Sequence, residues 1–487
     1  MLPEQLKALL ISIEKTKAES STLEIKAAHA GCPQKLYDTL SSFSNQDDGG
    51  IIIFGLDEMQ GFAPVGVYDA QDLQKKIKAQ ADQMQPPVRP VFTTVEWNGK
   101  TFVSAEIPPV DVSERPCFHA AKGRVKGSYV RIGDADQPMT EYEVYSYEAF
   151  RKRYQDDIRT VPDAGMKTFD MQRVDAYVGL CRKSKPNLSS LDDDLVRELM
   201  RLTRDGIPTL VSVLLFNLYP QAFFPQLVIT ATVSAGTSIA DNDPDQPRFL
   251  DNKRIEGTIP QMLDTALEFA LRNMKIKTVI DAESGKRKDR YEYPMPAVRE
   301  AVLNALVHRD YSIYTEGSPI TMNFFRDRLE ISNPGGLYGR IRIDQLGKVR
   351  ADTRNPVLAT ALETLGLTEN RYSGIPTIRN SMAAAGLPAP EFRTGDTFLV
   401  ILRNTEEKTT EISSSRQERN ILDFCITPKT RRQLADFLNI KSVSYAIKAH
   451  VTPLVDRGLL ELEVPSRPRS PRQRYFTSSK GKEACNI

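Results

Sequence analysis

The sequence predicts a multidomain protein of the α/β (α+β) class. Its 487 residues are enough for two to four domains, at roughly 100–200 residues for each. Stretches with apolar residues at helical spacing alternate with short apolar or alternating stretches that are typical of strands. Hydrophobic residues make up 40% of the chain and charged residues 26%, as in ordinary globular proteins.

The charge balance and the cysteines exclude several classes of protein. The 65 Lys and Arg residues nearly cancel the 63 Asp and Glu residues, so the net charge of +2 neither requires nor forbids a nucleic-acid partner. The five cysteines include no Cys-x-x-Cys pair, which excludes a zinc ribbon and argues against a disulfide framework. No apolar run approaches the ~18 residues of a membrane span, and the N-terminus lacks a signal-peptide core. We therefore expect a cytoplasmic protein without a membrane partner.

Residues 1–155 carry the pattern of one α/β domain. Apolar spacing predicts helices at 4–18 and 33–45, and the run IIIFGL predicts a buried strand. The alternating stretches 91–97 and 101–107 flank Asn98-Gly99, a dipeptide that strongly favours a hairpin turn. A strand at 128–132 and a helix at 141–153 complete the domain.

The rest of the chain divides into a connector, a second domain, a linker and a third domain. We place them at 170–250, 251–403, 404–416 and 417–487. The predicted helices are 191–204, 259–274 and 297–309, and the predicted strands are 212–217, 227–233, 319–325, 328–332 and 397–402. The linker is rich in Ser, Thr and Glu, a composition typical of flexible connections.

Three carboxylates near the N-terminus form a candidate metal site. Glu19 and Glu24 lie five residues apart, and Asp57 follows the IIIFGL strand. Carboxylates that converge at strand ends can hold Mg²⁺ or Mn²⁺, and such a metal supports phosphodiester hydrolysis. The alternative is a set of solvated surface carboxylates, because the chain contains 63 acidic residues in all.

Several short motifs of this region resemble, in type and order, those of the Schlafen-like AlbA-type domain. They are Glu19-x4-Glu24-x-Lys26, Phe43-Ser44-Asn45 before Gly49-Gly50, the strand end Gly55-Leu56-Asp57, and Arg131-Ile132-Gly133. The resemblance covers residues 15–150 and implies nucleic-acid binding. Some family members cut tRNA or other RNA with three carboxylates, which implies Glu19, Glu24 and Asp57 as catalytic and metal-binding residues.

Cations in the same region are candidate contacts to nucleic-acid phosphates. They are Lys26, Arg115, Lys122, Arg124, Lys126 and Arg131, of which we select Lys26, Arg124 and Arg131 as the site residues. The alternative is ordinary surface charge.

The helix predicted at 297–309 carries a polar stripe. Glu300, Asn304 and His308 recur every four residues and so share one helix face. Burying such a stripe is costly unless its polar groups have partners. An Asn carbonyl can bind Mg²⁺ beside nucleotide phosphates, and a Glu one turn earlier can orient an attacking water. The alternative is a satisfied structural hydrogen-bond network.

With this stripe, two later segments resemble the divergent GHKL-type ATPase domain over residues 250–403. They are Asn333-Pro334-Gly335-Gly336 after a strand, and Ser373-Gly374-Ile375. The resemblance implies ATP as the cofactor, Glu300 as the catalytic, water-orienting base, and Asn304 as the Mg²⁺ ligand. The residues that it implies for nucleotide binding are Asn304, His308, Asn333, Gly335, Ser373, Gly374 and Ile375.

Two departures from the GHKL pattern favour binding over hydrolysis. Asn333 stands where the wider class has an Asp that accepts from the adenine amine, although Asn can still accept. Tyr372 stands at the first glycine of the lid motif, where a Tyr cannot give the close backbone approach of Gly. No G-x-x-x-x-G-K-[ST] motif occurs, which excludes a P-loop helicase or motor.

The last segment, 417–487, has the pattern of three helices followed by two strands, and it resembles a winged helix-turn-helix domain. Its candidate nucleic-acid contacts are Lys441 and Lys448 in the recognition helix, and Arg472 and Arg474 in the basic wing. The alternative is a winged helix that makes protein contacts.

These observations predict an ATP-binding, nucleic-acid-binding protein whose N-terminal domain is controlled by nucleotide. The sharpest hypothesis makes that domain a metal-dependent endoribonuclease acting on tRNA or structured RNA, with a role in phage defence. The alternatives are a non-catalytic, ATP-switched DNA-binding transcription regulator and an assembly protein with a structural ATP site. Because an AlbA-type domain typically presents a basic groove only when paired, we also expect a homo-oligomer.

Overall fold

The structure is a computed structural model of the full chain, and it describes residues 1–238, 249–280, 287–349, 352–368, 373–404, 416–438, 440, 443, 447–463 and 473–478. The chain divides into two compact units, Met1–Asn404 and Thr405–Ile487. This division falls at the start of the segment that the sequence predicts as a linker.

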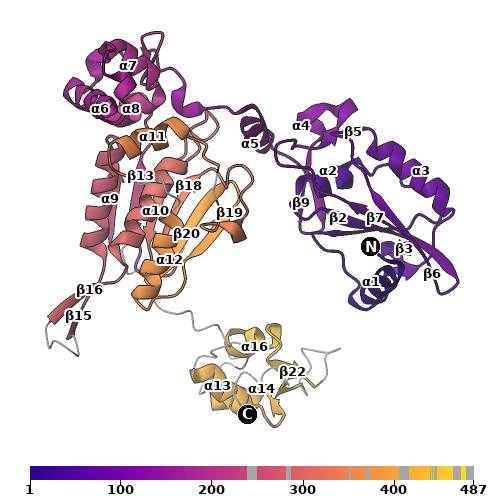
Figure 1. Cartoon of the computed structure of the whole chain (residues 1–487). Helices are drawn as coiled ribbons and strands as arrows, with labels where there is room; N and C mark the ends of the chain where they lie inside the picture. Colours follow the sequence, from indigo (N-terminus) through magenta and orange to yellow (C-terminus); the bar gives the residue numbers. More distant parts are fainter. Residues whose placement is uncertain are drawn as a thin grey trace. The chain divides into compact units, whose positions relative to one another are not determined.

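The N-terminal part of the first unit is built on a four-stranded sheet (Figure 1). Its strand order is β1-β2-β7-β6, with β1 parallel to β2 and the other pairs antiparallel. The sheet strands are β1 (Leu23–Lys26), β2 (Gly50–Phe54), β6 (Val91–Trp97) and β7 (Lys100–Ile107). The helices are α1 (Pro3–Thr16), α2 (Tyr37–Asn45), α3 (Ala70–Ala81), α4 (Gly123–Gly127) and α5 (Glu141–Lys152). Short strands are β3 (Leu56–Asp57), β4 (Ala63–Pro64), β5 (Met84–Gln85), β8 (Phe118–His119), β9 (Tyr129–Ile132) and β10 (Ala135–Pro138).

The apolar run of β2 is explained by helices that cover both faces of this sheet. Ile52 and Phe54 pack in one core cluster with residues of α2 and α3. Ile53 packs on the opposite face with Leu6 and Leu10 of α1. A strand that is buried on both faces needs apolar residues at successive positions rather than at alternate ones.

The central part of the first unit is built on a six-stranded sheet of order β14-β13-β17-β18-β20-β19. Its strands are β13 (Ile229–Val233), β14 (Asp251–Ile255), β17 (Ile320–Phe324), β18 (Arg328–Pro334), β19 (Glu391–Thr394) and β20 (Thr397–Arg403). Helices α9 (Ile259–Asn273), α10 (Met295–His308) and α12 (Gly374–Ala384) lie over one face of it (Figure 1). The remaining elements are α6 (Met171–Ser184), α7 (Asp193–Leu199), α8 (Leu210–Phe216), α11 (Pro356–Thr364) and the hairpins β11 (Thr203–Arg204) with β12 (Ile207–Pro208) and β15 (Ile276–Ile280) with β16 (Arg287–Tyr291).

Two sequence predictions are corrected in this part. Residues 212–217 were expected as a strand, but residues 212–216 lie in α8, all of whose residues are buried. A short apolar run that is buried on every side has no period by which to tell a helix from a strand. Strand β13, expected within the 170–250 connector, pairs with β17, and one hydrophobic core extends from Val161 to Leu402. The connector and the second domain therefore share their sheet and their core.

The second unit has its own small core and a three-stranded sheet of order β21-β23-β22. Its elements are α13 (Arg416–Phe424), α14 (Arg431–Phe437), a π-helical turn (Ile447–Val451), α16 (Thr452–Asp456), β21 (Lys429–Thr430), β22 (Leu460–Leu462) and β23 (Arg474–Thr477). Lys441 and Arg472 lie outside the described residues, as does the side chain of Lys448. The winged-helix assignment stays a prediction.

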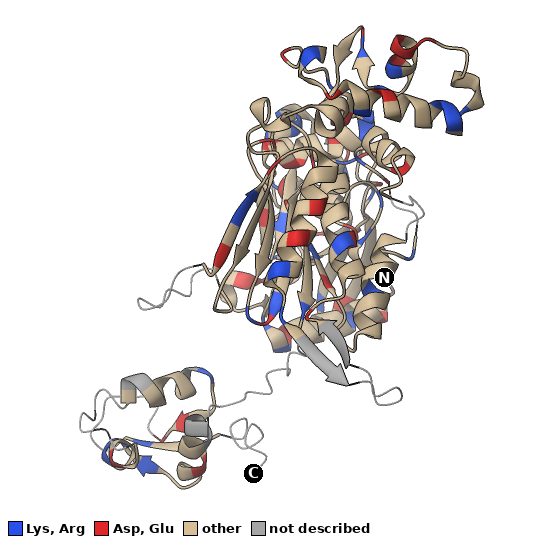
Figure 2. Ribbon diagram, turned by 90° about the vertical axis from the view of Figure 1, so that its left-hand side faces the viewer, with Lys and Arg blue, Asp and Glu red and all other residues tan. Residues whose placement is uncertain are grey.

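Charged residues of both signs are interspersed over the elements of the first unit (Figure 2). This distribution agrees with the net charge of +2, so any basic surface is local. Within the described ranges, no helix has the length and apolar character needed to cross a membrane.

Candidate functional site

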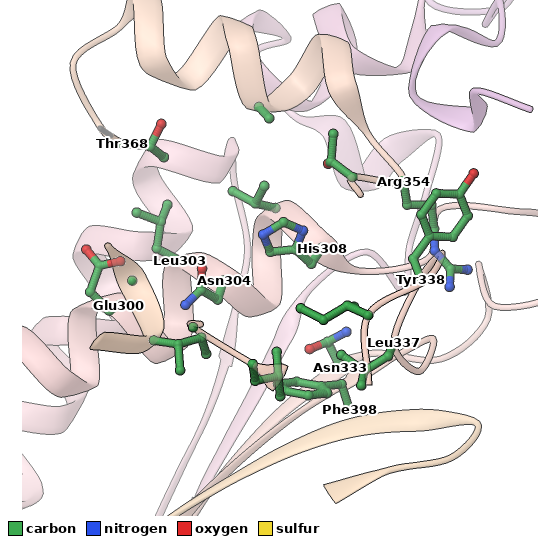
Figure 3. A pocket seen from close by; sticks show the side chains of 18 of the residues that line it. Glu300, Leu303, Asn304, His308, Asn333, Leu337, Tyr338, Arg354, Thr368 and Phe398 are labelled. Atoms are coloured by element: carbon green, nitrogen blue, oxygen red, sulfur yellow. The ribbon is translucent and has the colours of Figure 1, made fainter. Parts of the chain in front are cut away.

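A cavity of about 520 Å³ lies beside α10 in the central part of the first unit (Figure 3). The residues that the sequence assigned to a nucleotide site all line it: Glu300, Asn304, His308, Asn333, Gly335, Ser373, Gly374 and Ile375. The structure thus brings three separate segments of the sequence around one space.

Helix α10 contributes the polar stripe. Glu300, Asn304 and His308 project from it toward the cavity (Figure 3), while its remaining faces are buried among apolar residues. The spacing of four residues aligns the three side chains along the helix. Arg299 pairs with the Glu300 carboxylate at 3.2 Å, so this end of the cavity carries both charges.

The first turn of α12 meets this stripe. A Cβ atom on Gly374 would lie 3.0 Å from Asn304 Nδ2 and 3.0 Å from Glu300 Oε2. Glycine therefore allows an approach that a larger residue would obstruct. The backbone N–H groups of a first helical turn have no partner within the helix and favour anions.

Four polar atoms around the cavity are buried without a hydrogen-bond partner among the described residues. They are Asn304 Nδ2, Thr353 Oγ1, Arg354 Nε and Thr368 Oγ1. Leaving a buried polar atom unpaired costs about 1–3 kcal/mol. Such a lining fits a ligand with many hydrogen-bonding groups, and it argues against a closed structural network around Asn304.

The other end of the cavity contains residues that the sequence analysis missed. Arg354 forms an ion pair with Asp310, and the two side chains are 4% and 0% exposed. The Arg354 guanidinium lies 5.0 Å from the ring centroid of Tyr338, and Figure 3 shows the two side by side. Tyr142 of α5 donates a hydrogen bond to Asp310 at 2.9 Å. No local pattern marks these contacts, because each joins distant segments of the chain.

His308 ends the stripe of α10. Its side chain is exposed at the cavity, and Arg354 is a nearby cation. The protein atoms around the ring, and to a lesser extent Arg354, lower the pKa of His308 below its ordinary value. The imidazole is therefore neutral at pH 7 and offers one donor and one acceptor.

The N-terminal carboxylates surround an arginine. Arg131 Nη1 lies 2.8 Å from Glu24 and 3.1 Å from Asp136, and Arg131 Nη2 lies 3.7 Å from Glu19. Glu19 accepts from the backbone of Ile25 at 2.7 Å. Burial, followed by the charge of Glu24, raises the pKa of Glu19 to about 7.

Asp57 lies in a different environment from Glu19 and Glu24. Its carboxylate caps the turn that follows β3, accepting from Met59 N at 3.0 Å and from Gln60 Nε2 at 2.7 Å. The carboxylate that acts on Glu19 from this turn is Glu58, which raises the pKa of Glu19 further. Within the described ranges, no three His, Cys, Asp or Glu side chains are grouped to hold a metal ion.

Comparison with known families matches one segment in each of the two parts of the first unit. Residues 19–140 match the family described as "Schlafen, AlbA_2". Residues 317–402 match the HATPase_c_4 family, described as "Putative ATP-dependent DNA helicase recG C-terminal". The chain carries a Schlafen-type AlbA domain and an HATPase-type domain. This confirms both resemblances and the mixed α/β class, and it supports nucleic-acid binding and nucleotide binding by the chain.

Solved structures add distant likenesses, and no curated protein matches the chain. The crystal structure of the DIP2311 protein from Corynebacterium diphtheriae is 19% identical, with coverage of 99% of both chains and a TM-score of 0.39. The N-terminal domain of a "Putative ATP-dependent DNA Helicase RecG-related Protein" from Nitrosomonas europaea is 27% identical over 27% of this chain and 92% of that chain, with a TM-score of 0.23. At these TM-scores the two likenesses establish neither the fold nor the function of this chain.

The predicted phosphate contacts differ in their exposure and in their partners. Arg131 is corrected, because its side chain is 1% exposed and pairs with the carboxylates that surround it. Lys26 pairs with Glu24 but remains about one-third exposed, at 34%. Arg124 pairs with Glu148 at 2.5 Å and is 32% exposed. In the second unit, Arg474 is 53% exposed and lies 3.9 Å from Glu463.

Proposed function

We propose that this chain binds ATP in the α10 cavity and that nucleotide occupancy controls nucleic-acid binding by the AlbA domain. The observation that carries ATP binding is the cavity lining, in which the unpaired Asn304 Nδ2 and the Glu300 carboxylate lie against the first turn of α12 and further unpaired polar atoms line the same space. A triphosphate fits this end by its charge, since first-turn N–H groups attract anions. The base fits the opposite end, near Asn333 and Tyr338, with Asn333 accepting from the adenine amine.

Mg²⁺ is the metal proposed to accompany ATP. The Asn304 side-chain oxygen and the nucleotide phosphates would hold it, and it would neutralise phosphate charge. Glu300 is then the candidate for orienting water. Tyr372, at the lid position, lies outside the described residues, and its departure from glycine favours binding over turnover.

Helix α5 supports the idea of nucleotide control. Tyr142 of α5 bonds to Asp310, which pairs with the cavity residue Arg354. Strand β10 precedes α5 directly, and its Asp136 pairs with Arg131 between Glu19 and Glu24. A change in the position of Arg354 on nucleotide binding therefore has a short route to the AlbA carboxylates.

The finer proposals for the AlbA domain are an endoribonuclease and a non-catalytic regulator. Glu19 and Glu24 remain candidates for metal-dependent cleavage of tRNA or structured RNA, with a role in phage defence. A metal at these residues would have to compete with Arg131, whose guanidinium already pairs with them. This observation favours the second candidate, an ATP-switched DNA-binding transcription regulator that does not cut. The word "helicase" in the family description does not extend to this chain, since its sequence has no P-loop.

A single incubation series tests these alternatives. Purified protein is mixed with total tRNA or duplex DNA and with Mg²⁺ or Mn²⁺, in the presence and absence of ATP, alongside Glu24→Gln. Metal-dependent cleavage that Glu24→Gln abolishes would establish a nuclease. Binding that responds to ATP without cleavage would establish the regulator. Absence of ATP binding by calorimetry would overturn the proposal for the α10 cavity.

A further inference from the structure

We propose that a surface of the AlbA domain formed by Lys26, Lys35, Tyr37, His119 and Lys122 binds the phosphodiester backbone of a polynucleotide beside Glu19 and Glu24. We call it the Tyr37 surface. The inference rests on the proposed nucleic-acid binding and specifies where on the domain the strand lies. The sequence analysis named Lys26 and Lys122 among its candidate phosphate contacts, and it also named Arg131, but that arginine is buried.

The centre of the surface is the ring of Tyr37, the first residue of α2. Lys122 Nζ lies 3.9 Å from the ring centroid and donates a hydrogen bond to the Tyr37 hydroxyl. Lys35 Nζ lies 5.6 Å from the same centroid, and the His119 ring centroid lies at 5.1 Å. The Lys122 ammonium lowers the pKa of Tyr37, as expected for a cation held against a phenol. Two segments distant in sequence thus gather cations around one aromatic ring.

Lys122 is the cation best suited to an external anion. Among the described residues, no carboxylate lies within 4.0 Å of its ammonium, whereas other exposed lysines, such as Lys76 and Lys78, pair with aspartates in or directly after their own helix. Its contact with Tyr37 holds the amino group in place before a ligand arrives. A charge that is positioned in advance loses less conformational entropy on binding.

The surface is continuous with the carboxylate cluster. Lys35 pairs with Asp38 at 3.1 Å, and Asp38 acts electrostatically on Lys26. Lys26 in turn pairs with Glu24. The next residue of α2, Thr39, donates to Asp136 at 2.6 Å, and Asp136 holds Arg131. A strand whose phosphates contact Lys122 and Lys35 therefore leads to Lys26 and the Glu19–Glu24 pair.

The alternative is that Lys122 and Tyr37 only stabilise the loop before α4. An exposed cation–π contact is favourable enough for a purely structural role. The two roles differ in salt dependence. A phosphate contact adds about one to the slope of log affinity against log salt, whereas a structural contact leaves that slope unchanged.

The test is fluorescence anisotropy of the full chain with labelled single-stranded RNA, single-stranded DNA and duplex DNA of one sequence. We expect Lys122→Ala to weaken binding about fivefold at moderate salt and to reduce the salt slope by about one. Tyr37→Phe keeps the ring but removes the hydroxyl that positions Lys122, and we expect a loss of about twofold to threefold. Lys78→Ala is the matched control, since it removes one exposed lysine charge from α3 and should leave both quantities unchanged. Comparison of the three polynucleotides shows whether the surface binds RNA or DNA and whether it binds a single strand or a duplex.

The outcomes separate this inference from the proposed function. If the wild-type chain binds a polynucleotide and both Lys122→Ala and Tyr37→Phe bind as tightly as Lys78→Ala, the Tyr37 surface is wrong and nucleic-acid binding stands. If the wild-type chain binds none of the three, both proposals fail. Thermal unfolding of each variant shows whether a loss of polynucleotide affinity arises from misfolding. If Lys122→Ala is misfolded, the affinity of Tyr37→Phe decides between the two roles.

Discussion

Asn304 gives the most direct single-residue test of the nucleotide site. Its amide nitrogen is buried beside Gly374 without a hydrogen-bond partner among the residues described. Asn304→Ala should lower Mg-ATP affinity about tenfold or more, because hydrogen bonds to charged groups contribute about 1.5–3 kcal/mol. Calorimetric titration of the full chain measures the effect. Asn252→Ala, on the exposed surface of β14, is the control, and equal affinities for both variants would remove Asn304 from the site.

A second prediction for a single residue concerns Asp157, whose carboxyl should make the stability of the fold depend on pH. It is 0% exposed and accepts from the backbone N–H groups of Val357 and Leu358 at 2.9 and 3.0 Å, at the start of α11. Burial raises its pKa from 3.8 to about 6, outweighing the hydrogen bonds that lower it, and the charge of Asp156 adds to the rise.

The folded protein holds the Asp157 proton more tightly than the unfolded chain does, and this sets the direction in which the free energy of unfolding changes with pH. This contribution to stability is present below about pH 4 and is lost as the pH rises through 6. Asp157→Asn removes it, so the stability of the variant relative to wild type should improve by on the order of 2 kcal/mol between pH 4 and pH 7.5. Thermal unfolding at both pH values measures the difference. A constant difference would contradict the raised pKa.

Single residues also show what the sequence could and could not reveal. Glu300, Asn304 and His308 were found because the helical period is visible in the sequence. Arg131 was misassigned because an arginine in a short strand gives no sign of carboxylates brought to it from β1 and β10. Arg354 and Asp310 were missed because a buried ion pair between distant segments leaves no local pattern.

At the scale of elements, the first turn of α12 makes a distinct prediction. Gly374→Ala favours the helix by up to about 1 kcal/mol, yet its Cβ would lie 3.0 Å from both Glu300 and Asn304. We expect unchanged or higher thermal stability together with several-fold weaker ATP binding. Gly317→Ala is the control, because a Cβ there meets nothing within 4 Å. Wild-type ATP affinity in Gly374→Ala would mean that the nucleotide does not approach this turn.

Elements with a clear period were predicted close to their observed bounds, and those without one were not. The strands beside Asn98-Gly99 form β6 and β7, because alternation and turn chemistry agree there. Helix α8 was expected as a strand, because Val, Leu and Phe in a short buried run suit either structure. The pairing of β13 with β17 could not be predicted, because the two strands lie far apart along the chain.

At the scale of the first unit, α5 joins the two identified domains. It ends the AlbA part in sequence, and three of its side chains make contacts beyond it: Tyr142 bonds to Asp310, Tyr145 bonds to Asp156, and Phe150 packs edge-on against Tyr338 at 5.4 Å. Asp310 and Tyr338 both contact the cavity residue Arg354. The helix itself was predicted from its period, but its contacts were not, because they depend on the fold of the whole unit.

These contacts lead to the prediction that Tyr142→Phe uncouples the two domains. In wild type we expect ATP to change nucleic-acid affinity by about fivefold or more, within the 1–3 kcal/mol typical of coupled sites. Removing the Tyr142 hydroxyl breaks the hydrogen bond to Asp310 while preserving the ring and the Arg354–Asp310 pair. ATP should then bind with nearly unchanged affinity but no longer affect nucleic-acid binding.

Tyr145→Phe is the matched control, because its hydroxyl bonds to Asp156 at 2.7 Å and not to Asp310. Anisotropy titrations with and without ATP measure the coupling, and a full ATP response in Tyr142→Phe, or its equal loss in Tyr145→Phe, would show that control does not pass through Asp310.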